Sequence, residues 1–198
     1  MTRGIVLAAG ASTRMGRPKA LLPAAGGTFV RTILAALRDG GVADAVVVIR
    51  PGHEALAAEV AAAGHGRAVI NPRADEGQLS SLLAGLDAID DERLEAALVT
   101  LVDVPLVTVA TIRLLVARAA ASSAPIVRAV HGGRHGHPVI FKRPVFAALR
   151  AADPSVGAKE VVRSAGIEDV EVDDPGVLMD VDTPADYARL FGRTPPAC

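Results

Sequence analysis

Short runs rich in valine, isoleucine and leucine alternate along this chain with longer alanine- and leucine-rich segments of helical pattern. Such alternation is typical of βαβ units, in which a mainly parallel sheet carries helices on both faces. Strands are predicted at Gly4–Leu7, Ala45–Ile49, Ala68–Ile70, Ala97–Val102, Ile126–Val130, Val139–Phe141 and Val170–Val172. Helices are predicted at Thr28–Arg38, His53–Ala63, Leu79–Ala88, Val109–Ala121, Pro144–Ala151, Ala158–Ala165 and Pro184–Phe191. We therefore expect an α/β fold of the Rossmann-like, three-layer α/β/α kind, with a mainly parallel sheet and a small antiparallel element.

The length of 198 residues suits one domain with a substantial core. We assign this domain to residues 1–192 and expect residues 193–198 to form a frayed tail, because they carry no packing pattern. Three glycines between His131 and His137 indicate a mobile connection, followed by an antiparallel hairpin. Hydrophobic residues make up 51% of the chain but aromatic residues only 3%, so the core must consist mainly of small aliphatic side chains.

The distribution of charge narrows the choice of ligands. The formal net charge of −1 argues against nucleic acid or an acidic membrane surface as the partner, since both require a strong cationic field. The first 38 residues nevertheless carry six arginine or lysine residues and no aspartate or glutamate, which favours a small anionic ligand near the N-terminus. A single cysteine, Cys198, excludes an intrachain disulfide, and no signal-peptide pattern or bilayer-length apolar run is present, so we expect a cytoplasmic protein.

The N-terminal strand runs into a loop of mostly small residues that extends from Ala8 to Lys19. Small residues let the backbone approach a ligand closely, and successive N–H groups can form an anion-binding concavity. Arg14 and Lys19 add positive charge at its rim, which favours a nucleoside triphosphate. The spacing differs from a Walker loop, because five residues separate Gly10 from Gly16, and no G-x-G-x-x-G dinucleotide fingerprint is present. The loop is therefore predicted to be a phosphate loop of another kind.

The segment LAAGASTRMGRPK, from Leu7 to Lys19, resembles the signature L-A-A/G-G-x-S-x-R-M-G-x-x-K of the MobA-like nucleotidyltransferases. Four further motifs follow in the order of that family: Asn71-Pro72 with Glu76–Leu82, Asp103-Val104-Pro105, Gly136–Val139 and Asp180–Pro184. The resemblance spans nearly the whole chain and implies the nucleotide-diphospho-sugar transferase type of fold. The Ala-Ala-Gly form is similar to the molybdenum cofactor cytidylyltransferase branch, whereas the guanylyltransferase branch usually carries Ala-Gly-Gly. The resemblance thus favours CTP over GTP.

Two aspartates are candidate metal ligands. Asp103 follows an apolar strand, and α/β sheets bind ligands at the carboxyl ends of their strands. By resemblance, Asp103 and Asp182 hold Mg²⁺, which prefers such hard oxygen ligands, and Asp180 is a less favoured substitute for Asp182. The resemblance also implies that Arg14 and Lys19 neutralise the β and γ phosphates and stabilise departing pyrophosphate. Arg14, Lys19 and Asp103 are therefore the predicted catalytic residues.

Further residues are predicted to bind the two substrates. The predicted nucleotide contacts are Leu7, Ala8, Ala9, Gly10, Ser12, Arg14, Lys19, Gly77, Ser80 and Ser81. The last three belong to a segment that is typical of a helix N-terminus, and the family contacts the nucleotide there. The acceptor, a terminal phosphate on a pterin by resemblance, is predicted to bind His137 and Lys159. No general base is assigned, because a phosphate nucleophile is already ionised at neutral pH.

Several of these residues also have a purely structural interpretation, and the N-terminal loop with its two cations could be an ordinary solvated turn between a strand and a helix. Asp103 or Asp182 could cap the helix that follows, and the serines could simply be first-turn helix residues. Lys159 could be a solvated helix residue. His135 and His137 alternate along the chain, but without a third ligand nearby we interpret them as loop residues and not as a metal site.

Taken together, the residues and the resemblance predict a Mg²⁺-dependent nucleotidyltransferase that moves CMP from CTP to the phosphate of molybdopterin cofactor and releases pyrophosphate. A client molybdoenzyme is a further possible partner. A guanylyltransferase or sugar-phosphate nucleotidyltransferase is the alternative within this class. The family includes an oxidoreductase of a nicotine-derived pigment, so an NAD(P)H-dependent oxidoreductase and a non-catalytic module of molybdoenzyme maturation are alternatives of other classes. The missing dinucleotide fingerprint counts against the oxidoreductase.

Overall fold

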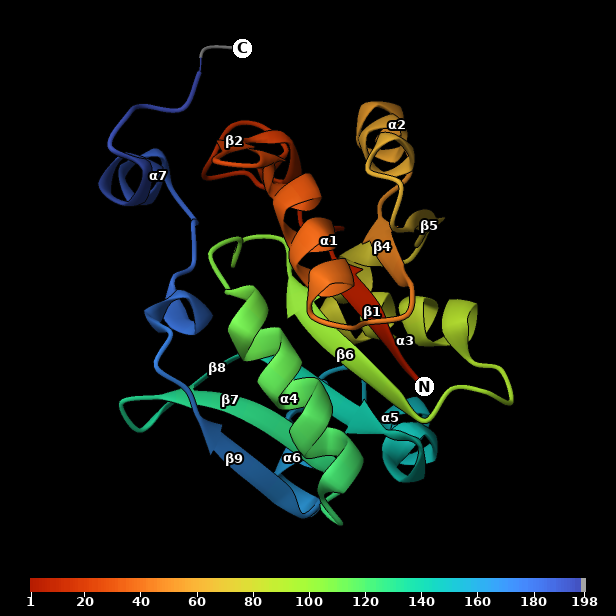
Figure 1. Ribbon diagram of the computed structural model, residues 1–198. Helices are drawn as coiled ribbons and strands as arrows, with labels where there is room; N and C mark the ends of the chain where they lie inside the picture. The colour runs from red at the N-terminus through yellow and green to blue at the C-terminus, as the bar shows by residue number, and fades with distance from the viewer. Residues whose placement is uncertain (197–198) are drawn as a thin grey trace.

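The computed structural model describes residues 1–196 and is built around a seven-stranded sheet with the order β5-β4-β1-β6-β8-β7-β9 (Figure 1). The strands are β1 (Thr2–Leu7), β4 (Ala45–Ile49), β5 (Arg67–Ile70), β6 (Ala96–Leu101), β7 (Ile126–His131), β8 (Arg134–Lys142) and β9 (Ile167–Glu171). Strand β8 is antiparallel to both of its neighbours, and every other pairing in this sheet is parallel. The predicted mainly parallel α/β sheet with a small antiparallel element is confirmed.

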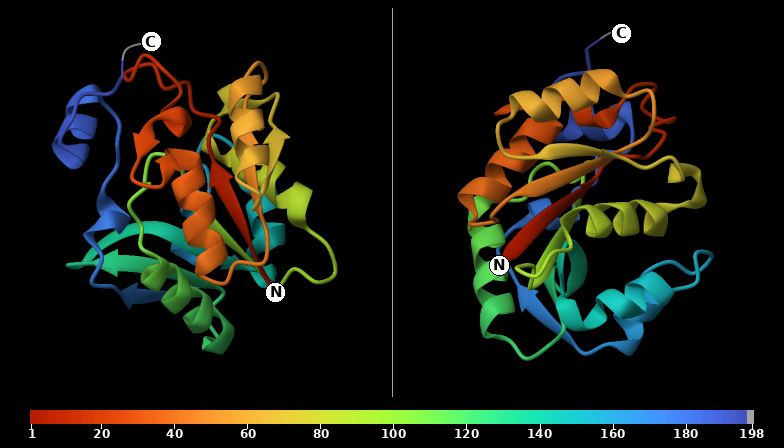
Figure 2. Two further views of the ribbon diagram at one scale, coloured as in Figure 1. Left: turned by 45° about the horizontal axis from the view of Figure 1, so that its top comes forward. Right: turned by 90° about the vertical axis from the view of Figure 1, so that its right-hand side faces the viewer.

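Helices cover both faces of the sheet, as the two views in Figure 2 show. They are α1 (Phe29–Asp39), α2 (Glu54–Ala62), α3 (Gln78–Ile89), α4 (Val109–Ala121), α5 (Phe146–Ala151), α6 (Lys159–Ser164) and α7 (Pro184–Phe191). Short 3₁₀ turns lie at η1 (Lys19–Leu21), η2 (Ala74–Glu76), η3 (Arg143–Val145) and η4 (Pro175–Leu178). Helices α1 and α4 pack on one face, and α3, α5 and α6 pack on the other. None of the helices in the described part of the chain has the length and apolar character needed to span a lipid bilayer.

The core is divided by the sheet into two apolar layers, because successive side chains of a strand point to opposite faces. In β1, Val6 packs in the layer that contains α1 and α4, whereas Ile5 and Leu7 pack in the layer of α3. Helix α3 approaches β1 closely at Gly85, where an added Cβ would lie 2.5 Å from Cγ2 of Ile5. One apolar layer lies on each face of the sheet. The parallel strands β1, β4, β5 and β6 present their carboxyl ends at the same edge.

The segment from His131 to His137, which we predicted to be a mobile connection, is part of a hairpin. Strand β7 ends at His131 and β8 begins at Arg134, so only Gly132 and Gly133 form the turn. Both glycines have positive φ, 57° and 74°, which suits a two-residue hairpin turn and keeps the strands paired. The segment is therefore a tight turn with paired strand residues, and not the longer connecting loop that we expected from its glycines.

The C-terminal helix α7 docks on the start of the chain through a small aromatic cluster. Phe29, Tyr187 and Phe191 stack with ring centroids 4.7–6.1 Å apart, and the Tyr187 hydroxyl donates to the Pro23 carbonyl at 2.8 Å. Pro23 lies in a small antiparallel pair, β2 (Pro23–Ala24) and β3 (Gly27–Thr28), which the sequence analysis did not predict. The predicted tail, residues 193–198, extends beyond the described residues, and Cys198 lies outside them.

Candidate active site

The loop after β1 folds back on itself at the carboxyl edge of the sheet. Ser12 adopts a positive φ of 50°, and its carbonyl accepts hydrogen bonds from the backbone N–H groups of Met15 and Gly16, both at 3.1 Å. The Met15 side chain is buried against the aromatic cluster under α7. The Ser12 hydroxyl accepts a hydrogen bond from the Lys19 N–H at 3.3 Å. These contacts fold the loop so that Arg14 and Lys19 come near the end of β6 and the start of α7.

Lys19 lies between two aspartates that are distant in sequence. Its Nζ is 3.2 Å from Oδ2 of Asp103 and also forms an ion pair with Asp182. Arg14 reaches the other oxygen of Asp182, with Nη2 and Oδ2 2.8 Å apart. The Lys19 side chain is 11% exposed and that of Arg14 is 67% exposed. The structure thus brings together all four charged residues that were predicted to act on the phosphates and the metal.

Neither aspartate caps a helix. Thr108 caps α4, and Thr183 caps α7 in a capping box with Asp186, so the structural interpretation of Asp103 and Asp182 as helix caps does not apply. The Val181 N–H donates to the Asp103 carbonyl at 2.8 Å, which joins the two loops directly. Within residues 1–196, neither carboxylate accepts a hydrogen bond from the backbone, and the contacts of both are with the cationic side chains of Lys19 and Arg14.

A divalent cation fits this pair of carboxylates. Oδ1 of Asp103 is buried and has no hydrogen-bond partner among residues 1–196, and a cationic group, the Lys19 ammonium, already lies against both carboxylates. No three histidine, cysteine, aspartate or glutamate side chains converge on a metal position in the described part of the chain. Two carboxylates suit Mg²⁺, which takes its other ligands from phosphate and water.

The charges around Lys19 shift the pKa values of the C-terminal aspartates in opposite directions. The hydrogen bond from Lys19 is the main cause that lowers the pKa of Asp182 below its ordinary value, and Arg14 contributes. Desolvation raises the pKa of Asp180, and the neighbouring carboxylates of Asp103 and Asp182 raise it further. The ion pairs with Lys19 and Arg14 thus favour the charged form of Asp182, whereas the surroundings of Asp180 disfavour its charged form.

A buried aspartate that the sequence analysis missed connects the two carboxylate-bearing loops. Asp174 is 4% exposed and accepts hydrogen bonds from the Thr108 N–H at 2.8 Å, the Thr111 hydroxyl at 2.7 Å and the Gly176 N–H at 3.0 Å. Burial alone would raise its pKa, but these hydrogen bonds lower the pKa of Asp174 below its ordinary value. Gly176 is required here, because an added Cβ would lie 2.3 Å from the Leu106 carbonyl oxygen. The network fixes the start of α4, just after Asp103, against the segment that leads to Asp182.

A cavity of about 300 Å³, which we call the loop cavity, lies beside this cluster. Its lining contains most of the predicted nucleotide contacts: Leu7, Ala9, Gly10, Ser12, Lys19, Gly77 and Ser81, together with Asp103. Three predicted contacts lie outside the lining. Ala8 packs in the core, Arg14 is paired with Asp182, and the Ser80 hydroxyl lies 2.7 Å from the Arg73 carbonyl oxygen. The amide of Asn71 donates to both serine hydroxyls, at 3.0 Å to Ser80 and 3.1 Å to Ser81.

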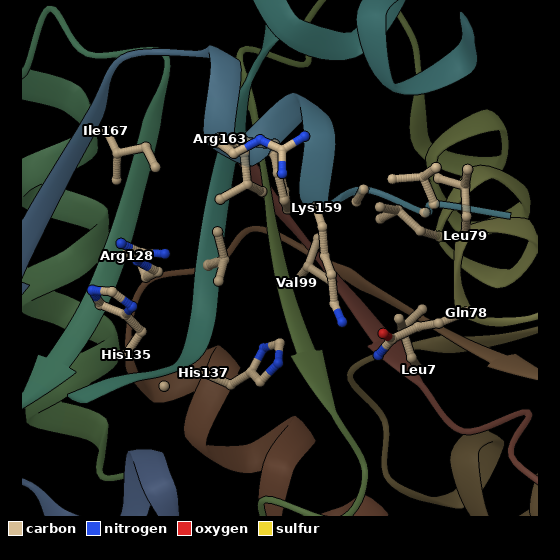
Figure 3. A pocket seen from close by; sticks show the side chains of 18 of the residues that line it. Leu7, Gln78, Leu79, Val99, Arg128, His135, His137, Lys159, Arg163 and Ile167 are labelled. Atoms are coloured by element: carbon tan, nitrogen blue, oxygen red, sulfur yellow. The ribbon is translucent and has the colours of Figure 1, made fainter. Parts of the chain in front are cut away.

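A larger cavity of about 780 Å³, which we call the sheet cavity, adjoins the loop cavity on the α3 and α6 side of the sheet (Figure 3). Leu7 and Gln78 line both cavities. The two predicted acceptor residues, His137 and Lys159, line the sheet cavity. Burial lowers the pKa of His137, against smaller opposing effects of the Val99 backbone and of Asp103, and so favours the neutral imidazole.

Two arginines in the sheet cavity were not predicted. Arg128, on β7, is held by the Asp169 carboxylate at 2.9 and 3.1 Å, and Arg163 lies on α6. The position of Arg163, four residues after Lys159, could have indicated that both lie on one face of a helix. No local signal marked Arg128, because its position depends on the pairing of β7 with β8 and β9.

Comparison with known proteins finds similarity over almost the whole chain. Residues 4–171 match the family model described as MobA-like NTP transferase domain. The chain is 34% identical to nicotine blue oxidoreductase from Paenarthrobacter nicotinovorans, with 95% of each chain covered, and 24% identical to molybdenum cofactor cytidylyltransferase from Escherichia coli K12, with 96% and 95% covered. The crystal structure of Rv0371c from Mycobacterium tuberculosis H37Rv superposes with a TM-score of 0.82 at 30% identity, covering 98% of this chain and 99% of that chain. A second structure of Rv0371c, in complex with manganese, superposes with a TM-score of 0.77 at 29% identity, with the same shares covered.

Proposed function

Because this chain belongs to the MobA-like NTP transferase family, we propose that it transfers CMP from CTP to the terminal phosphate of a molybdopterin-type acceptor, with Mg²⁺ bound by Asp103 and Asp182. The observation that carries this proposal is the contact of Lys19, from the N-terminal loop, with both aspartates at the wall of the loop cavity. The likeness to molybdenum cofactor cytidylyltransferase supports the choice of acceptor, and the manganese complex of Rv0371c supports a divalent metal.

In this reaction an oxygen of the acceptor phosphate forms a bond to the α-phosphorus of CTP. The bond from that phosphorus to the oxygen bridging the β phosphate breaks, and its electron pair leaves with pyrophosphate. Bound Mg²⁺ would neutralise charge on the phosphate oxygens. Lys19 and Arg14, released from the aspartates, stabilise the negative charge that develops on pyrophosphate. Backbone N–H groups of the loop around Gly10 orient the phosphates, and no residue needs to remove a proton from the ionised acceptor.

The sheet cavity supplies the second substrate site in this proposal. It adjoins the loop cavity at Leu7 and Gln78, so an acceptor there lies next to the α phosphate of a nucleotide in the loop cavity. Lys159 attracts the acceptor phosphate, and the neutral His137 can donate one hydrogen bond to it. Exclusion of water by the apolar walls of the cavity limits hydrolysis of CTP.

Pyrophosphate release tests this proposal. We expect release from CTP in the presence of molybdopterin cofactor and Mg²⁺, weaker release from GTP, and none in EDTA. Asp103→Asn should reduce the rate at least about 100-fold, because one carboxylate ligand and its charge are lost. Glu92→Gln, which changes an exposed carboxylate outside both cavities, is the matched control and should retain the wild-type rate. Release that is unchanged by Asp103→Asn would contradict the assigned site.

The identity to nicotine blue oxidoreductase over 95% of each chain favours a second candidate, an NAD(P)H-dependent oxidoreductase. Calorimetric titration with CTP, GTP and NADPH, each with and without Mg²⁺, distinguishes the two. Metal-dependent binding of CTP supports the transferase. Binding of NADPH without any response to the triphosphates would replace it with the oxidoreductase.

A further inference from the structure

The sheet cavity is lined by basic side chains and by no acidic ones among the described residues. No aspartate or glutamate is among its described lining residues, whereas Arg128, Lys159 and Arg163 are. The rest of the wall is largely apolar and includes Leu79, Leu82, Val99, Val139, Phe141 and Ile167. At about 780 Å³ the cavity is in the range of drug-sized ligand sites. Its ligand must therefore combine an apolar body with negative charge.

Two of the three cations have no partner among residues 1–196. The side chains of Lys159 and Arg163 form no hydrogen bond or ion pair within residues 1–196, whereas Arg128 is held by Asp169. The nearest acidic residue before α6 is Asp153, which accepts from the Ser155 N–H at 2.8 Å and from its hydroxyl at 2.7 Å, and does not line the cavity. Lys159 and Arg163 are both exposed, and Glu160 stands between them in α6 but does not line the cavity. An anion in the cavity can therefore pair with either cation without breaking an existing ion pair.

The side chains of Lys159 and Arg163 point toward different parts of the cavity. Figure 3 shows Lys159 extending toward His137 and Gln78, on the side that borders the loop cavity at Leu7. Arg163 is directed away from that group. The apolar side chain of Val99 lies between these regions in the same view. A single small anion near His137 would leave Arg163 without a partner.

We propose that the sheet cavity binds an acceptor with two anionic groups joined by an apolar body: the reacting phosphate at Lys159 and His137, and a second anion at Arg163. This inference rests on the proposed transferase function, because it identifies the phosphate near Lys159 as the one that receives the nucleotidyl group. The inference makes Arg163 a specificity residue, because Arg163 would bind an anionic group of the acceptor that lies away from the reacting phosphate. Binding energy from that remote group would orient the acceptor for transfer.

A pair of fluorescent probes tests the second anion directly. 2-Naphthyl phosphate carries one anionic group on an apolar body, and 6-carboxy-2-naphthyl phosphate carries two. Each is titrated into the protein without nucleotide or metal, and the probe's emission is followed, which the chain permits because it has no tryptophan. We expect the carboxylated probe to bind about tenfold more tightly to the wild-type protein, the increment of one charged hydrogen bond.

Two variants test which cation binds which anionic group of the probe. Arg163→Gln should abolish the preference for the carboxylated probe, and Lys159→Gln should weaken both probes by a similar factor of about ten. Arg93→Gln, which removes an exposed arginine outside the cavity, is the matched control and should bind both probes as the wild type does. Thermal unfolding of each variant verifies that it is folded. Equal weakening of both probes by Arg163→Gln, no preference in the wild-type protein, or no binding of either probe would overturn the proposal.

The proposal and the transferase function can fail separately. If Asp103→Asn abolishes pyrophosphate release from CTP but the wild-type protein does not prefer the carboxylated probe, the acceptor class is wrong and the transferase stands. If the probe preference depends on Arg163 but CTP is not turned over, the cavity still selects a dianion and the reaction must be another one.

Discussion

The two cavities differ in how their positive charge is balanced. In the loop cavity Lys19 is paired with Asp103 and Asp182, and Arg14 at its side is paired with Asp182. In the sheet cavity Lys159 and Arg163 have no partner among residues 1–196. One cavity therefore contains an internal set of opposite charges, and the other carries exposed cations that form no ion pair within the described residues.

In the proposed reaction, the two substrates therefore differ in whether their binding breaks ion pairs that already exist in the protein. Under the proposed function, a triphosphate with its metal exchanges existing ion pairs, because the metal binds the carboxylates of Asp103 and Asp182 and the phosphates bind Lys19 and Arg14. An anionic acceptor forms new ion pairs without breaking any. We expect the loop cavity to bind the metal–nucleotide complex more tightly than either component. The metal alone leaves Lys19 and Arg14 without an anionic partner, and the nucleotide alone leaves the two aspartates without a cation.

The largest effect that tests this comparison is expected for Lys19→Met. Removing the ammonium should reduce pyrophosphate release at least about 100-fold, or about 3 kcal/mol in activation free energy, because charge on the departing phosphates is no longer stabilised. Steady-state rates at saturating CTP measure this loss. Full activity in Lys19→Met would mean that the ion pairs at the loop cavity have no part in the reaction.

Asp174→Asn tests whether the fold holds the paired carboxylates in place. The variant should lose about 3 kcal/mol of unfolding free energy at pH 7, because a buried carboxylate that accepts several hydrogen bonds is replaced. The lowered pKa of Asp174 means that its contribution is complete above the ordinary aspartate pKa and is lost as the pH falls through the folded-state value. The difference between wild type and variant should therefore shrink below about pH 4.

Urea unfolding at pH 7 and at steps down to pH 3 measures that difference. Asp173→Asn, at the exposed neighbouring position, is the matched control and should change stability by less than about 0.5 kcal/mol. A difference between wild type and Asp174→Asn that stayed constant with pH would show that the hydrogen-bonded carboxylate is not its source.

A comparison of two lysine variants sharpens the contrast between the cavities. In Lys19→Met, Mn²⁺ without nucleotide should bind about tenfold more tightly, because the metal no longer competes with an ammonium for the carboxylates. Lys159→Met should leave Mn²⁺ affinity unchanged, since Lys159 contacts no carboxylate within the described residues. Titrations followed by electron paramagnetic resonance measure free Mn²⁺. Weaker Mn²⁺ binding in Lys19→Met would mean that the lysine supports the metal and does not compete with it.

The smallest effect is expected for the double variant Lys159→Gln with Arg163→Gln. Its unfolding free energy should equal that of the wild type or exceed it by up to about 0.5 kcal/mol, because a like-charge pair is removed and no ion pair is lost. Thermal unfolding at low ionic strength, where the repulsion is least screened, measures the change. A clear loss of stability would indicate that these cations have partners in the protein after all.

The sequence alone predicted the layers of the fold and the charged residues at the loop cavity. Local periodicity marks the longer strands and the helices, and short motifs that resemble those of a known family carry Lys19 and Asp103, so no knowledge of distant contacts was needed. The β2–β3 pair was missed because two-residue strands have no periodicity. The role of Gly132 and Gly133 was misjudged because glycine is typical of both tight turns and flexible loops.

The parts of the site that could not be predicted depend on contacts between distant segments. Asp174 is one of several aspartates near the C-terminus, and only its burial against Thr108 and Thr111 distinguishes it. Similarly, the lack of ion pairs at Lys159 and Arg163 becomes visible only when every neighbouring carboxylate is located. The motifs therefore identified Arg14, Lys19, Asp103 and Asp182, whereas the tertiary structure was needed to find Asp174, Arg128 and Arg163 and to determine which charges are paired.

The reversed direction of β8 has a consequence for how such proteins can diversify. Because β8 runs antiparallel to β6, its first residues lie at the edge of the sheet where the parallel strands end. The wall of the sheet cavity continues along the chain from these residues to α6 and the start of β9. Residues 135–167 thus encode most of that wall as one contiguous block. Recombination or exchange of this block between relatives could change the choice of the second substrate while the first 134 residues, with the N-terminal loop and Asp103, stay as they are.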